Sequence, residues 1–104
     1  MWQDVNIPGI EKIERLVAEF VIWELYISPY AKFRVKIYES RDDGFSGVAN
    51  LQIKDSSGRF VAVTGYGKTI EETLQDTLSS FFEITAYKEI REFEESDFNC
   101  SEDF

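Results

Sequence analysis

The side chains that could carry out chemistry in this chain lack the partners that catalysis requires. Cys100 is the only cysteine, and the sequence contains no histidine. A nucleophilic thiol or hydroxyl needs an adjacent base, most often histidine. Cysteine and histidine clusters are also the usual ligands of structural zinc. We therefore expect a non-enzymatic protein with no zinc site and no intrachain disulfide.

Two short motifs resemble parts of known cofactor-binding or metal-binding sites, but neither motif is complete. Residues 65–69 end in Gly-Lys-Thr, as a P-loop does, but the first glycine of that motif is missing at the required spacing. Asp42 and Asp43 lie in a predicted turn, and their surroundings lack the ligand spacing of an EF-hand. We interpret these motifs as a turn with a helix cap and as a simple turn, and we expect no cofactor.

Charge is distributed in two opposed blocks. The 20 acidic and 11 basic residues give a formal net charge of −9. Residues 83–104 hold eight carboxylates against Lys88 and Arg91, whereas residues 29–68 hold seven basic against four acidic side chains. Such a field biases the choice of partner and repels phosphate. We expect a basic protein partner, with no direct binding of nucleic acid or of a membrane.

The candidate partner-binding residues are exposed carboxylates and nearby aromatic side chains. Aromatic residues are enriched in interface hot spots and are rare in purely solvating tails. The first cluster lies in the C-terminal segment and comprises Glu89, Glu92, Glu94, Glu95 and Asp97, with Phe93 and Phe98 as apolar anchors. The second cluster comprises Asp42, Asp43, Glu71, Glu72 and Asp76, with Tyr66 as its anchor.

Hydrophobic periodicity predicts a helix followed by strands. Apolar residues recur at three- and four-residue spacing over residues 9–27, which is typical of an amphipathic helix, and Pro8 suits its first turn. Residues 32–39 alternate between basic and apolar side chains, and strands are also expected over 46–54 and 59–64. The outer face of this sheet would present Lys32, Arg34, Lys36, Asn50, Gln52 and Lys54.

A second helix is predicted from Thr69 onward. Thr69 and Glu72 match a capping box, and an apolar run at helical spacing follows them. The expected order is α-β-β-β-α: an α+β domain over residues 1–86, in which two helices pack on one face of a three-stranded antiparallel sheet. Residues 87–104 would form an acidic, aromatic tail.

Residues 61–74 read VAVTGYGKTIEETL, and this stretch resembles the strand-to-helix corner of double-stranded RNA-binding domains. That resemblance implies the α-β-β-β-α fold and a phosphate contact through Lys68, although Glu71 and Glu72 stand where that family has lysines. The same corner is similar to HicB-type antitoxins. By size, charge and topology the chain also resembles small acidic phage-encoded inhibitors, such as anti-CRISPR proteins and other nucleic-acid mimics.

These observations lead to one functional hypothesis and one alternative. The first is a non-catalytic inhibitor whose carboxylates occupy the basic groove of a nucleic-acid-handling protein, as a DNA mimic does. The alternative is a nucleic-acid-binding or HicB-like antitoxin module that uses the basic sheet face. No secretory signal and no membrane-spanning apolar run are seen, and we expect a cytoplasmic location, in a bacterial host cell if the protein is phage-encoded.

Overall fold

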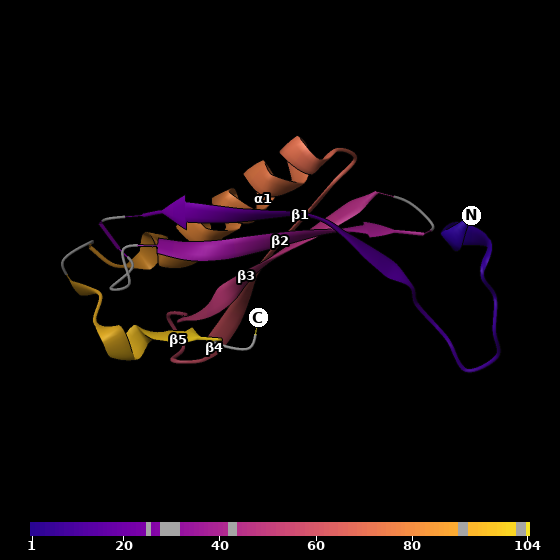
Figure 1. Cartoon of the computed structure of the whole chain (residues 1–104). Coiled ribbons are helices and arrows are strands. Elements are labelled where there is room, and N and C mark those ends of the chain that lie inside the picture. Colours follow the sequence, from indigo (N-terminus) through magenta and orange to yellow (C-terminus); the bar gives the residue numbers. More distant parts are fainter. Residues whose placement is uncertain (25, 28–31, 42–43, 90–91, 102–103) are drawn as a thin grey trace.

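The computed structural model describes residues 1–24, 26–27, 32–41, 44–89, 92–101 and 104. Within those ranges, an antiparallel five-stranded sheet carries one α-helix on one face (Figure 1). Strands β1 to β4 are neighbours in chain order, and β5 pairs with β3. The elements are β1 (Glu14–Trp23), β2 (Lys32–Ser40), β3 (Phe45–Lys54), β4 (Phe60–Gly67), α1 (Ile70–Ile84) and β5 (Phe98–Cys100), with short 3-10 turns at Trp2–Asp4, Thr85–Tyr87 and Glu95–Asp97.

The α+β class is confirmed, but the predicted order and strand number are wrong. The segment expected to form a first helix over residues 9–27 instead contains β1, which pairs with β2 from Glu14 to Trp23. Cross-strand ion pairs join Arg15 to Glu39 at 2.7 Å and Arg34 to Glu19 at 3.7 Å. The order in the described residues is therefore β-β-β-β-α-β.

Pro8 was assigned to the first turn of that helix, and it lies instead in a tight turn. The amide of Ile10 donates to the carbonyl of Ile7 at 3.0 Å, and Gly9 adopts a φ of 93°. Proline followed by a residue with positive φ is the pattern of a type II turn, which favours glycine in the second central position. The Pro-Gly pair therefore ends the N-terminal segment before β1 begins.

The apolar face of the sheet forms the core, as the alternation in the sequence predicted. Phe33, Val35 and Ile37 of β2 are almost completely buried, and so are Leu51 and Ile53 of β3. Their basic neighbours Lys32, Arg34 and Lys36 face the opposite, open side. The strands over 32–39 and 46–54 are thus confirmed within one residue at each end.

Helix α1 packs so closely on the sheet that glycine is required beneath it. A Cβ atom added to Gly65 would lie 2.4 Å from the backbone nitrogen of Thr77, and one added to Gly67 would lie 2.8 Å from that of Thr73. We expected residues 65–67 to break the third strand, but β4 continues through Gly67. These glycines keep the strand surface flat where the helix axis crosses it.

Two threonines and a phenylalanine form the buried seam of α1. Thr73 and Thr77 are fully buried, together with Phe81. Their hydroxyl groups donate to the carbonyls of Thr69 and Thr73, each at 2.7 Å. This local bonding satisfies the hydroxyls, so their burial beside glycine leaves no polar atom unpaired.

The predicted start of α1 is confirmed by its cap. Thr69 is the N-cap, and its Oγ1 accepts the amide of Glu72 at 3.1 Å. The Glu72 carboxylate accepts the amide of Lys68 at 3.1 Å, one residue before the position that a capping box uses. Both bonds satisfy amides that the helix cannot pair internally.

We expect Thr69→Ala and Glu72→Ala each to lower the free energy of unfolding by about 1 kcal/mol, because each removes one cap bond. Denaturant midpoints measured by circular dichroism will check this value. Ser79→Ala, an exposed change in the middle of α1, is the control and should alter the midpoint little. Equal midpoints for all three variants would show that the cap contributes nothing.

Asn50 marks the point where β3 changes its pairing partner. β2 pairs with residues 45–49 of β3, and β5 pairs with residues 51–53. Residues 52 and 53 also pair with β4, so β5 lies on the same side of β3 as β2.

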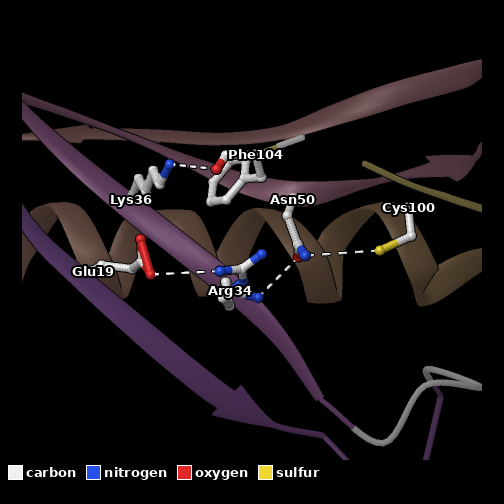
Figure 2. A network of polar contacts seen from close by, with 6 residues as sticks. All are labelled: Glu19, Arg34, Lys36, Asn50, Cys100 and Phe104. Atoms are coloured by element: carbon white, nitrogen blue, oxygen red, sulfur yellow. Dashed lines mark hydrogen bonds and ion pairs between the residues drawn. The ribbon is translucent and has the colours of Figure 1, made fainter. Parts of the chain in front are cut away.

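The point where β3 passes from β2 to β5 forms a fork, and Asn50 bridges it. Its Oδ1 accepts the amide of Arg34 at 2.9 Å, and its Nδ2 donates to Sγ of Cys100 at 3.7 Å (Figure 2). Asn50 was predicted to be an open-face residue, and these bonds explain why it is buried instead.

Candidate protein-binding surface

The corner between β4 and α1 brings together the described members of the second predicted cluster, Glu71, Glu72, Asp76 and Tyr66. The Asp76 carboxylate accepts the amide of Tyr66 at 2.9 Å, and Glu72 accepts the amide of Lys68 on the same corner. Glu71 is exposed beside them, and the Tyr66 side chain is 70% exposed. This corner therefore presents three carboxylates and an exposed aromatic side chain.

The exposed side of α1 carries negative charge along its whole length. Glu71, Glu72, Asp76 and Glu83 are all exposed, and the helix sequence contains no lysine or arginine. With a rise of about 1.5 Å per residue, Glu72 and Asp76 are separated by about 6 Å along the axis, and Glu72 and Glu83 by about 16 Å. Glu83 was not among the predicted site residues, although its place in the same helix could have identified it.

The first predicted cluster, in the C-terminal segment, divides into exposed and structural residues. Glu89, Glu92, Glu94 and Glu95 are exposed, beyond the C-terminal end of α1. Asp97 is 7% exposed, and its Oδ2 lies 2.8 Å from Nζ of Lys88. Asp97 is therefore committed to an internal ion pair, and its assignment to a docking surface is corrected.

The environment of Asp97 stabilises its charged form. The hydrogen bond from Lys88 and a second bond from the amide of Glu94, at 2.9 Å, lower the pKa of Asp97 below its usual value. The same contact with Asp97 raises the pKa of Lys88. Hydrogen bonds to an ionised group favour that ionised state, so the pair fixes the turn at Glu95–Asp97 when both groups are charged.

The aromatic residues of the C-terminal segment anchor it to the fold. Phe98 is 5% exposed and belongs to the core, so it cannot serve as an exposed anchor for a partner. Phe93 is half-buried between Tyr87 and Phe98, with ring centroids 6.0 and 5.9 Å away. The Tyr87 hydroxyl donates to the carbonyl of Lys54 at 2.6 Å. Instead of forming a free tail, this segment packs on the edge of the sheet.

The basic side of the sheet is occupied by other parts of the chain. The Lys36 Nζ donates to the backbone oxygen of Phe104 at 2.6 Å, and the Phe104 ring lies 4.6 Å from the same nitrogen. Arg34 lies 5.9 Å from that ring and forms the ion pair with Glu19 (Figure 2). Two of the cations on the open face therefore already have partners within the molecule.

Asp42 and Asp43 lie outside the described residues. In the part of the chain that the structure describes, no group of three or more potential metal ligands is found. No described helix is long and apolar enough to cross a membrane. No protein-family model, curated protein or solved structure matches this chain, so the surface is interpreted from its own geometry.

Proposed function

We propose that this protein is a non-catalytic binding module that docks its acidic helix side in the basic groove of a nucleic-acid-handling protein. In this role it acts as an inhibitor, in the manner of a DNA mimic or an anti-CRISPR protein. The observation that carries the proposal is the exposed side of α1, where four carboxylates occur without a single basic residue. Four more exposed carboxylates, Glu89, Glu92, Glu94 and Glu95, follow the helix in the chain.

The mechanism is competition for the groove. Basic grooves bind phosphates through Lys and Arg side chains, with release of counterions. Carboxylates on a folded helix can occupy such a groove with little further ordering, because the backbone that holds them is already fixed. Asp76 and Glu72 are held further by their bonds to backbone amides. The complex should therefore form quickly at low salt and weaken as salt rises.

The alternative, nucleic-acid binding through the basic sheet face, has less support. Arg34 and Lys36 are engaged with Glu19 and Phe104, and the net charge of −9 repels phosphate at long range. We therefore expect the purified protein not to retard duplex DNA or RNA in a mobility-shift assay at physiological salt. Sub-micromolar binding of either duplex would overturn the proposed function.

The main experiment uses the purified protein, immobilised, and the heparin-binding fraction of a bacterial lysate, which is enriched in proteins with basic grooves. We expect the immobilised protein to capture a protein from this fraction, and we expect added duplex DNA to release that captured protein. Glu71→Gln with Glu83→Gln removes two charges without touching a cap bond, and should weaken capture about tenfold at low salt. The amount captured is measured across a salt series.

The matched control is Asp4→Asn with Glu11→Gln, which removes the same number of charges from exposed positions in the N-terminal segment. This control should capture the partner nearly as well as the unchanged protein. Equal loss in both double variants would mean that only net charge matters. If nothing that binds the protein is displaced by duplex DNA, the proposed function is wrong.

A further inference from the structure

A strip of large apolar side chains, partly exposed, lies along one flank of α1. Ile70, Leu74, Leu78 and Phe82 follow one another at intervals of four residues, which places them on one continuous ridge of the helix. Leu74 and Leu78 are only partly buried, and Phe82 is 53% exposed. We call these four residues the α1 strip. Ile70, Leu74 and Leu78 pack against the margin of the core, because Thr73, Thr77 and Phe81 occupy its centre and leave the strip at the side of the helix.

The sheet beside the α1 strip is also incompletely covered. α1 packs on β4 and reaches β3 and β2. Val35 and Phe33 of β2 are almost completely buried, whereas Phe20 and Ile22, their partners in register on β1, are only half-buried. A second helix would cover this part of the face in the two-helix fold that the sequence predicted. Within the described residues, no such helix is present.

Two surface depressions follow the α1 strip. One, of about 360 Å³, is lined by Leu74, Leu78 and Phe82 together with Glu71, Gln75 and Ser79. The other, of about 410 Å³, joins Ile70 to Leu16 and Val17 of β1 and is also lined by Arg15, Glu39 and Phe45. Ile70 and Leu74 are one helical turn apart, so the two depressions succeed one another along the helix.

The charge beside the strip determines what can cover it. Glu71 and Glu83 are exposed near its two ends, and α1 supplies no cation. A second copy of this chain would bring the same carboxylates together, and like charges repel. A helix with an apolar ridge and flanking Lys or Arg residues would match both the strip and its carboxylates, in the usual helix-in-groove mode.

We infer that the α1 strip is the docking site for a basic amphipathic α-helix, and that such a helix lines the groove of the protein's partner. This inference rests on the proposed function and adds a defined apolar contact to it. The partner helix lies beside α1, places its apolar residues against Leu74, Leu78 and Phe82, and directs its cations toward Glu71 and Glu83. Apolar contact then supplies specificity that charge alone does not give.

The test uses a fluorescein-labelled peptide of about 18 residues, five turns of helix, built from Leu and Lys in amphipathic order. A second peptide has the same composition in an order that lacks the helical period. We expect the amphipathic peptide to bind at least tenfold more tightly by fluorescence anisotropy. In NMR spectra, shift changes should be concentrated in residues 70–84 and in the inner face of β1.

Phe82→Ser should weaken binding of the amphipathic peptide about tenfold. Phe60→Ser is the matched control, since Phe60 is 43% exposed on β4 and lies outside the strip. Gln75→Arg adds a cation to the lining without removing packing, and it should weaken binding even if Phe82→Ser proves unstable. Unchanged affinity in both Phe82→Ser and Gln75→Arg would overturn the inference.

The possible outcomes separate this inference from the proposed function. Equal affinity for the two peptides would show that they bind through charge alone. This result would overturn the α1 strip as a docking site and leave the basic-groove proposal intact. If the protein captures a lysate protein that DNA displaces but binds neither peptide, the docking site is again overturned and the basic-groove proposal again stands. If the amphipathic peptide binds at the strip but no lysate protein that DNA displaces is captured, the docking site is supported and the basic-groove function is overturned.

Discussion

Gly65→Ala should lower the free energy of unfolding by about 3 kcal/mol or more, a large part of the stability of a domain of this size. The added methyl would lie 2.4 Å from the backbone nitrogen of Thr77 and 2.7 Å from its Cα atom. Backbone atoms in the middle of a helix cannot move aside singly, so α1 as a whole would have to lift from β4. Denaturant midpoints by circular dichroism provide the measurement.

Gly47→Ala is the informative comparison. Its added methyl would lie 2.3 Å from Oγ1 of Thr77, a side-chain atom, with Ile37 Cδ1 next at 3.1 Å. Adding Thr77→Ala removes the first obstacle and should restore much of the stability lost in Gly47→Ala. The same second change should do little for Gly65→Ala, because the backbone contact remains. If Thr77→Ala rescued both variants equally, α1 would not lie on the sheet as described.

Asp97→Asn should cost about 2 kcal/mol at neutral pH, because a nearly buried charge-assisted hydrogen bond is lost. The side chain of Asp97 is 10% exposed and meets Lys88 at 2.8 Å. Glu95→Gln removes the same charge from an exposed position in the same turn and is the control. A similar midpoint for the two variants would mean that the Lys88 pair does not hold the segment.

The pH dependence of the same comparison gives a second test. The folded-state pKa of Asp97 is lowered from the ordinary aspartate value of 3.8, so its stabilising effect is present above that value and is lost as pH falls through the lowered pKa. The difference in stability between the unchanged protein and Asp97→Asn should therefore stay constant near neutral pH. It should shrink once the solution is more acidic than about pH 4.

The sequence predicted β2, β3 and α1 well because each is marked by local chemistry. Alternation along β2 and the cap at Thr69 depend on near neighbours only. β1 was mistaken for a helix because its register shifts between Leu16 and Ala18. That irregularity changes which face successive residues occupy, so the apolar residues on its two sides fit a helical spacing better than a strict alternation.

The orientation of α1 could not be predicted from hydrophobicity alone. The predicted apolar run was Ile70, Leu74, Leu78, Phe81, Phe82 and Thr85, and of these only Phe81 and Thr85 are buried. The threonines at 73 and 77 and the glycines at 65 and 67 were the missed signal, since small residues on both elements permit close packing. Among the predicted site residues, the carboxylates of the β4–α1 corner lie exposed in the first two turns of the helix, where the sequence placed them. The burial of Asp97 and Phe98 depends on pairing with β3, nearly fifty residues away, which no local pattern reveals.

The fork at Asn50 also makes β5 the sheet's least secured strand. β5 is only three residues long and pairs with one strand, β3, whereas β2 and β3 each have strands on both sides. Native proteins open such units locally long before they unfold globally, and deuterium exchange at backbone amides reports that opening. When β5 detaches, residues 51–53 of β3 lose their hydrogen-bonding partners on that side, and Leu51 and Ile53 are among the most apolar in the core. An unpaired apolar edge is a template for strand addition between molecules, so we expect loss of the Lys88–Asp97 pair, which lies next to β5, to make the protein more prone to aggregate.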